Sequence, residues 1–280
     1  MRQLTKKFLE EFEVYLMEEE KSRATIRKYI CDLKKFFDFA GEKDVSKTLA
    51  MEYKEYLLKH KNYEISSVNS FLTALNCFLD FVGWSDAKVK TCKVQKAGFA
   101  AEEKYLTKAE YKRLVQAARR KGNTRLALIF NTICSTGIRI SELGYITVES
   151  VRKGKAVIHN KGKVRTILIP KELQRDLKLY IEQKKIENGA IFCTGSGKCM
   201  DRSNIWREMK ALYKEADVDA EKIFPHNLRH LFAQCFYSLK KDIAKLADVL
   251  GHSSIETTRI YIRTTCEEHR KQLEMLGLVV

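Results

Sequence analysis

The stretch from Phe224 to Arg263 constrains the fold of this chain more than any other part of the sequence. On a helical wheel with about 100° per residue, the apolar residues between 226 and 239 fall on one face: Leu228, Leu231, Phe232, Cys235 and Leu239. His226, Arg229 and His230 fall on the opposite face with i, i+3, i+4 spacing. Pro225 suits the first turn of a helix, which places the helix start just before His226. We therefore predict a helix that buries its apolar face and presents imidazole and guanidinium groups together.

The segment after this helix predicts two more helices. An apolar stripe between residues 243 and 250 stops at Gly251, a typical C-terminal cap, and His252 follows in the turn. Ser253 and Glu256 have the spacing of a capping box, which opens a short helix that carries Tyr261 near its end. An arginine, two or three imidazoles and a phenol near helix ends suit an anion such as phosphate.

An arginine also follows an earlier buried helix. Residues 126–134 are nearly all apolar, as expected at the centre of a core, and the pattern stops at Ser135-Thr136-Gly137. Arg139 and Glu142 come next with i, i+3 spacing. Taken alone, this spacing favours a structural ion pair between the two side chains.

The rest of the chain predicts a mainly α fold with one small antiparallel β-sheet. Residues 1–83 contain four helical apolar stripes, and residues 155–169 switch to a strand pattern with a turn at Asn160-Lys161-Gly162-Lys163. Thr107 is expected to cap a helix, and further helices are expected at 173–186 and 203–216. Lys161 lies at the tip of this hairpin, where a solvated turn lysine is the default interpretation. We place a helical domain at 1–95, a linker at 96–104 and an α+β domain at 105–280.

The charge of the chain points to a polyanionic partner. Lys and Arg number 52 against 36 Asp and Glu, which gives a net charge of +16. Residues 1–95 carry 17 basic and 15 acidic residues, so most of the excess lies in residues 96–280. The aperiodic stretch 84–104 contributes a basic strap that can lie along phosphates: Lys88, Lys90, Lys93 and Lys96. No apolar run approaches the ~18 residues that a membrane span requires, so we expect no membrane partner.

The eight cysteines predict free thiols in a reducing compartment, because no Cys-x-x-Cys pair occurs and Cys134 and Cys235 lie in apolar stripes. The N-terminus is charged from Arg2 onward and shows no apolar signal segment. We expect a soluble, cytoplasmic protein.

Five motifs, in this order along the chain, resemble those of the tyrosine recombinases of the lambda-integrase and Xer-like family. They are Thr136-Gly137-x-Arg139-x-Ser141-Glu142-Leu143, the hairpin Lys161-Gly162, His226-x-x-Arg229-His230, Leu250-Gly251-His252-Ser253-Ser254 and Thr257-Thr258-x-Ile260-Tyr261. The resemblance covers essentially the whole chain. It implies a SAM-like, core-binding helical domain followed by a catalytic domain.

The resemblance also implies a role for each residue of the site. The catalytic set is Arg139, Lys161, His226, Arg229, His252 and Tyr261, supported by Glu142 and His230. Tyr261 is the nucleophile that forms a 3′-phosphotyrosyl bond, His226 assists it, and Lys161 protonates the departing 5′ oxygen. The two arginines and His252 bind the phosphate oxygens. Lys163 and Arg165 are expected to contact DNA phosphates.

The same resemblance sets the expected partners. We expect double-stranded DNA, no metal and no cofactor, because the phosphotyrosyl linkage conserves the bond energy for rejoining. The terminal segment Glu267–Leu278 is expected to form a helix that exchanges between protomers of a homo-tetramer on two DNA sites, with a hetero-tetramer as the alternative. The expected function is integration or excision of a mobile element, and the alternative is Xer-type resolution of chromosome or plasmid dimers.

Three other functions are consistent with parts of the sequence. His226-x-x-x-His230 has metal-binding spacing, but Asn227 replaces the glutamate that a metalloprotease needs. A non-catalytic DNA-binding regulator would account for the charge and leave the His/Arg pair and Tyr261 without a use. A type IB topoisomerase shares the tyrosine chemistry, although the compact N-terminal helices resemble the recombinases more closely. After Tyr261 the chain has Ile262-Arg263 where the family often has Thr-His.

Overall fold

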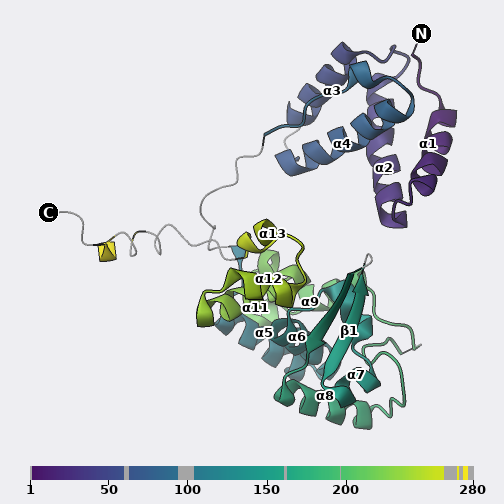
Figure 1. Cartoon of the computed structure of the whole chain (residues 1–280). Helices are drawn as coiled ribbons and strands as arrows, with labels where there is room; N and C mark the ends of the chain where they lie inside the picture. The colour runs from purple at the N-terminus through teal and green to yellow at the C-terminus, as the bar shows by residue number, and fades with distance from the viewer. Residues whose placement is uncertain are drawn as a thin grey trace. The chain divides into compact units, whose positions relative to one another are not determined.

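The computed structural model describes residues 2–59, 63–93, 104–160, 163–195, 197–261, 270 and 274–276. The chain divides into two compact units, Met1–Lys96 and Ala97–Val280, each with a hydrophobic core of its own. Figure 1 shows the first unit as helices alone and the second as helices with one small sheet. This confirms the predicted mainly α fold with a small antiparallel β-sheet.

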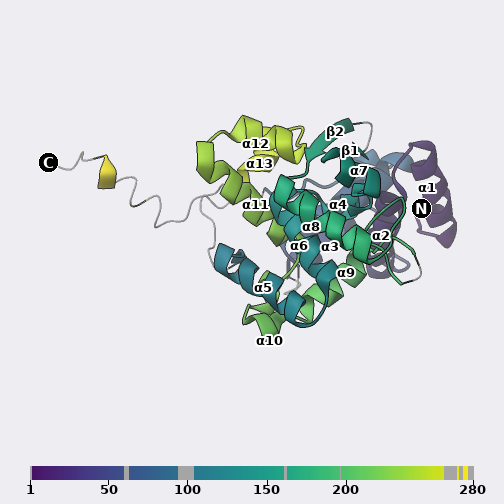
Figure 2. The ribbon, with the colours of Figure 1, turned by 90° about the horizontal axis from the view of Figure 1, so that it is seen from below.

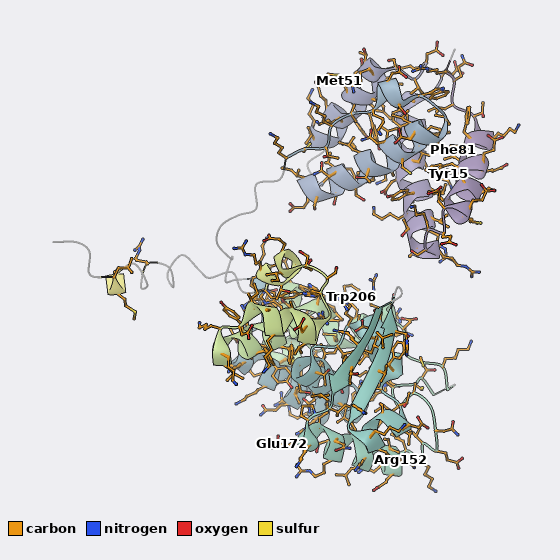
Figure 3. The ribbon with its side chains drawn as sticks, in the orientation of Figure 1. Tyr15, Met51, Phe81, Arg152, Glu172 and Trp206 are labelled. Carbon is orange, nitrogen blue, oxygen red and sulfur yellow. The ribbon has the colours of Figure 1, made fainter. Side chains whose placement is uncertain are left out.

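The N-terminal unit is a bundle of four helices that bury their apolar stripes against one another. They are α1 (Lys6–Glu18), α2 (Arg23–Ala40), α3 (Lys47–Lys59) and α4 (Ile65–Phe81). Ser22 caps α2 by accepting a hydrogen bond from the backbone N–H of Thr25, as a helix start requires. Partly buried aromatic side chains pack against the core: Tyr15 of α1 and Phe81 of α4, labelled in Figure 3, have ring centroids 4.9 Å apart.

The residues after α4 pack onto the bundle through two asparagines. After the short 3₁₀ helix η1 (Ser85–Ala87), the amide of Asn76 donates to the carbonyl of Val89 and accepts from its N–H. Asn69 makes the same pair of hydrogen bonds with Cys92. The first part of the basic strap is therefore fixed on α4 by the pairing of its backbone groups.

The C-terminal unit is built around α6 (Thr124–Thr136), most of whose side chains are buried. Helices α5 (Lys108–Arg120), α8 (Lys171–Gln183), α9 (Arg202–Lys210) and α11 (Pro225–Lys240) pack against it. Seen from below in Figure 2, α12 and α13 lie beside α11. The remaining helices are η3 (Ile140–Tyr145), α7 (Val148–Lys153), α10 (Tyr213–Ala216), η4 (Ala220–Lys222), α12 (Ile243–Leu250) and α13 (Ile255–Arg259).

The sheet consists of β1 (Lys155–Asn160) and β2 (Lys163–Leu168), which pair antiparallel with Lys155 opposite Leu168 and Asn160 opposite Lys163. Ala156, Ile158 and Ile167 are buried in the core of the unit, whereas the residues between them face outward. This alternation is the period of two that a half-buried strand requires. The turn residues Lys161 and Gly162 lie outside the described part of the chain.

Three local predictions are wrong. Leu239 was expected in the apolar stripe of α11 but is 80% exposed, because it lies near the end of the helix, beyond the buried positions 227–233. The cap of α13 is Ser254 and not Ser253, so the helix starts one residue later. The helix expected at 203–216 is divided into α9 and α10. No helix in the described part of the chain is long and apolar enough to span a bilayer.

Candidate active site

The turn after α6 brings Arg139 to the site. Gly137 ends α6 with φ +64°, in the left-handed region that glycine adopts readily, and a Cβ there would meet the Phe232 ring at 2.5 Å. The absence of a side chain at Gly137 therefore lets the backbone pass close to Phe232 of α11. Arg139 follows in extended conformation and caps η3. Its side chain remains about one third exposed.

Glu142 is a buried carboxylate that binds two arginines. Its Oε1 accepts from the Arg139 guanidinium at 3.0 Å, and its Oε2 accepts from Arg165 at 2.5 Å and from the backbone N–H of Arg139 at 2.9 Å. Burial alone would raise the pKa of Glu142, but these donors outweigh burial and lower its pKa. Glu142 is thus ionised at neutral pH and fixes the direction of both guanidinium groups.

Arg165 connects the sheet to the loop that carries His252. Besides Glu142, its guanidinium donates to the carbonyl of Val249 at 3.2 Å. A Cβ on Gly251 would lie 2.4 Å from the Arg165 side chain, so the arginine passes where only a glycine leaves room. The role of Arg165 as a phosphate contact stays a prediction, and its position favours holding β2 against this loop.

Arg229 is almost fully buried, with 2% of its surface exposed. It donates to the carbonyl of Gly137, to the carbonyl of Leu250 at 2.8 Å, and to Nε2 of His252 at 3.0 Å. Burial, with the nearby Arg139, lowers the pKa of Arg229 to about 10, so it stays charged at neutral pH. A buried arginine that binds two helix ends and an imidazole joins α6, α11 and α12 at one point.

Tyr261 lies among three imidazole rings. Its hydroxyl is 3.2 Å from Nε2 of His226, and its side chain is 4% exposed. The ring centroids of His226, His230 and His252 lie 5.5, 5.2 and 5.6 Å from its own. Burial and the nearby arginines lower the pKa of His226, so its ring is neutral at pH 7 and can accept a proton from the phenol.

His230 is buried inside the C-terminal unit. Its ring stacks on Tyr105 with centroids 3.8 Å apart and planes at 12°. Burial lowers the pKa of His230 to about 4, so the ring is neutral. The neighbouring His226 faces Tyr261, and no group of three or more His, Cys, Asp or Glu suited to a metal occurs among the residues that the structure describes.

A cavity of about 610 Å³ opens beside the arginines. Its lining includes Arg139, His226 and Arg229 and four residues of α9: Arg202, Ser203, Trp206 and Arg207. Figure 3 labels Trp206, which is half exposed. Sequence reasoning missed these α9 residues, although two arginines and a tryptophan on one short helix are a signal for an anionic or aromatic ligand.

The predicted residues fall into three groups. The structure brings together Arg139, Glu142, Arg165, His226, Arg229, His230, His252 and Tyr261. Lys161 and Lys96 and the side chain of Lys163 lie outside the described residues. Lys88, Lys90 and Lys93 belong to the N-terminal unit, where Lys88 pairs with Asp80 at 2.7 Å.

Chemically, the assembled groups suit a phosphodiester. Three guanidinium groups with a single carboxylate among them leave a net positive charge, which favours an anion. A buried phenol with a neutral imidazole at hydrogen-bond distance can act as a nucleophile with its base. The described part of the site therefore offers anion-binding groups, a nucleophile and a base for displacement at phosphorus.

Comparison with known proteins gives matches to both units of the chain. The Phage integrase family matches residues 104–268, and the phage integrase N-terminal SAM-like domain matches residues 9–85. The chain is 30% identical over 285 residues to tyrosine recombinase XerA of Pyrococcus furiosus, which covers 99% of this chain and 96% of that protein.

Two solved structures extend this result. The crystal structure of XerA recombinase matches with a TM-score of 0.54 and 26% identity, covering 97% of this chain and 98% of that chain. A lambda integrase tetramer bound to a Holliday junction matches with a TM-score of 0.73 and 16% identity, covering 92% of this chain and 77% of that chain. The second likeness is one of fold alone.

Proposed function

The chain belongs to the tyrosine recombinase family and is a site-specific DNA recombinase, and from this premise we propose that Tyr261 is its nucleophile. The Tyr261 oxygen attacks the scissile phosphorus while His226 takes the phenolic proton. The bond from phosphorus to the 5′ oxygen breaks, and a 3′-phosphotyrosyl bond forms. The observation that carries this proposal is the 3.2 Å contact between the Tyr261 hydroxyl and Nε2 of His226.

The arginines would stabilise the charge that develops on the phosphate. Arg139 and Arg229 approach the same cavity from η3 and α11, and a guanidinium can hold two phosphate oxygens at once. His252 would add a hydrogen bond to a non-bridging oxygen. Because these groups are already held by Glu142 and by backbone carbonyls, they need little rearrangement when charge appears.

Lys161 would protonate the departing 5′ oxygen. The strands on either side of it end at Asn160 and Lys163, and Arg165 holds β2 against the loop before His252. Because β2 is held against the site by Arg165, this arrangement supports a catalytic role for a lysine in the same hairpin. The role of Lys161 stays a prediction, since the residue lies outside the described part of the chain.

Double-stranded DNA is the proposed partner of both units. The net charge of +16 supports this, and the arginines and Trp206 of α9 extend the catalytic cavity with groups that bind phosphates and bases. We further propose that four protomers act on two DNA sites through exchange of the segment Glu267–Leu278. The matching lambda integrase fold occurs as a tetramer on a Holliday junction, which supports an assembly of this size.

Two biological roles remain candidates. We propose integration or excision of a mobile element, and the end-to-end match with XerA favours Xer-type resolution of DNA dimers as the second candidate. Selecting the preferred duplex from a random pool and locating it in the source genome distinguishes them. A site at the ends of a mobile segment supports the first, and one site on each replicon supports the second.

A nicked suicide duplex carrying the selected site tests the chemistry. The wild-type protein should form a covalent adduct with this duplex in EDTA and without ATP. Tyr261→Phe should bind the duplex as tightly and form no adduct, because only the nucleophilic oxygen is lost. An adduct that persists in this variant would overturn the proposal.

A further inference from the structure

His252 is held at both of its ring nitrogens. Its Nε2 lies 3.0 Å from a guanidinium nitrogen of Arg229, and its Nδ1 lies 2.8 Å from Oγ1 of Thr258. A guanidinium nitrogen only donates hydrogen bonds, so Nε2 must accept. The proton of the neutral ring is therefore on Nδ1, which donates to the Thr258 hydroxyl. The hydrogen-bond chemistry of the partners thus determines the tautomer.

This tautomer does not suit the role that His252 has in the proposed function. The ring nitrogen of His252 that faces Arg229 is Nε2. To donate a hydrogen bond to a phosphate oxygen, Nε2 must carry a proton, but in the free protein it has a lone pair. Burial and the neighbouring arginines lower the pKa of His252 to about 4, so a second ring proton is absent at neutral pH. The ring has to move its single proton from Nδ1 to Nε2.

Thr258 is placed to allow this change. It lies on α13 three residues before Tyr261, and its side chain is fully buried. A hydroxyl can accept from Nδ1–H and, after rotating, can donate to a bare Nδ1. The adjacent Thr257 is exposed to solvent.

We propose that Thr258 is a positioning residue that holds the His252 ring in both tautomers, so that Nε2 becomes a donor when phosphate enters. One proton leaves Nδ1 and one joins Nε2, so the charge of the ring is unchanged and exchange with solvent suffices. The inference rests on the proposed role of His252 as a phosphate donor. It assigns to a buried threonine the function that a carboxylate or carbonyl has beside many reactive histidines.

The first test measures the tautomer directly. Protein labelled with ¹⁵N in its six histidines gives ring nitrogen shifts, and the His252→Gln variant identifies those of His252. In the free protein the shifts should show a protonated Nδ1. With orthovanadate as the phosphate-class probe, the proton should move to Nε2. A protonated Nε2 in the free protein would overturn the inference.

The second test measures cleavage of the suicide duplex in a single turnover. Thr258→Val preserves the shape and removes the hydroxyl, and we expect its cleavage rate to fall about tenfold, the cost of one buried hydrogen bond. Duplex affinity should stay within about twofold, because the hydroxyl does not contact DNA directly. Thr258→Ser should stay near the wild-type rate, and Thr257→Val serves as the matched control on the exposed neighbour.

The outcomes separate this inference from the proposed function. If His252→Ala, which removes the donor, cleaves at the wild-type rate, the phosphate-donor role of His252 fails. If His252→Ala is slow while Thr258→Val cleaves normally, only the role of Thr258 fails. A Thr258→Ser variant as slow as Thr258→Val would assign the effect to the lost methyl group and would also contradict the inference. Thermal unfolding of each variant identifies any loss that comes from misfolding.

Discussion

The guanidinium of Arg165 on β2 donates to the Glu142 carboxylate at 2.5 Å, and the same carboxylate binds Arg139. One buried acid therefore joins β2, a strand of the hairpin whose turn contains Lys161, to the arginine that lines the catalytic cavity. The two guanidinium groups therefore have different roles. Arg139 points to the cavity, whereas Arg165 acts through its neighbours.

Replacing Arg165 should destabilise the fold as well as slow cleavage. Arg165→Met removes the hydrogen bonds to Glu142 and Val249, which should lower the free energy of unfolding by about 1–3 kcal/mol. Arg259→Met serves as the matched control, because Arg259 pairs with Glu256 on the exposed surface and should change stability by less than ~0.5 kcal/mol. Urea unfolding measures both. Equal effects would contradict the structural role of Arg165.

Acid should destabilise the protein partly through His230. Its pKa is about 4 in the folded chain and ordinarily about 6.5, so between these values the unfolded chain binds a proton that the folded chain does not. Stability should therefore fall as pH drops from 7 to 4, with His230 contributing on the order of 1–3 kcal/mol. His230→Phe keeps an aromatic ring against Tyr105 and should flatten this part of the pH dependence.

The control for this prediction is His159, whose side chain is exposed on β1. His159→Gln should leave the pH dependence of unfolding unchanged, as measured by urea unfolding at pH 7, 6 and 5. A His230→Phe variant as sensitive to acid as the wild type would show that the buried ring does not titrate as described.

The helical wheel located the site residues but not their environment. It placed His226, Arg229 and His230 on a face opposite the apolar stripe, and the structure buries Arg229 and His230 as well. Periodicity marks which residues share a face, whereas burial depends on which element covers that face, here the loop at Leu250 and Tyr105. The positions of these covering elements depend on long-range packing, which local spacing does not record.

The same reason explains two contacts that the sequence did not predict. Thr258 and Arg165 have no unusual spacing, and their contacts with His252 and Glu142 join residues that pack together only in the folded unit. By contrast, the β-hairpin and the helix cap at Thr107 are local, and both predictions are confirmed. Turn chemistry and alternation act over a few residues, so the sequence alone suffices for them.

A change of the leaving group in the DNA substrate should distinguish a general acid at Lys161 from a phosphate-binding lysine. Lys161→Ala should slow cleavage of an ordinary duplex on the order of 10²-fold or more, the contribution of a general acid. A duplex with a 5′-thiolate leaving group needs little protonation and should largely escape this defect. Lys163→Ala is the neighbouring control and should affect both duplexes alike. Equal loss of both substrates in Lys161→Ala would remove it from the catalytic set.

Truncation after Arg263 tests the proposed assembly. The shortened protein should still bind one half-site and remain folded, because the described core residues of both units all precede this point. It should lose cooperative binding to the full site and recombination, because the exchanged segment is gone. Gel-shift titration and sedimentation of the complex measure the difference. Normal full-site assembly by the truncated chain would contradict the exchange.

The covalent link to Tyr261 is the central claim, and peptide mapping tests it most directly. The trapped protein–DNA adduct is digested with nuclease and trypsin, and the nucleotide-bearing peptide is identified by mass spectrometry. We predict that it is Ile260-Tyr261-Ile262-Arg263 with the nucleotide joined through its 3′ phosphate to the phenol. A nucleotide on any other of the twelve tyrosines, or on another residue type, would contradict the account.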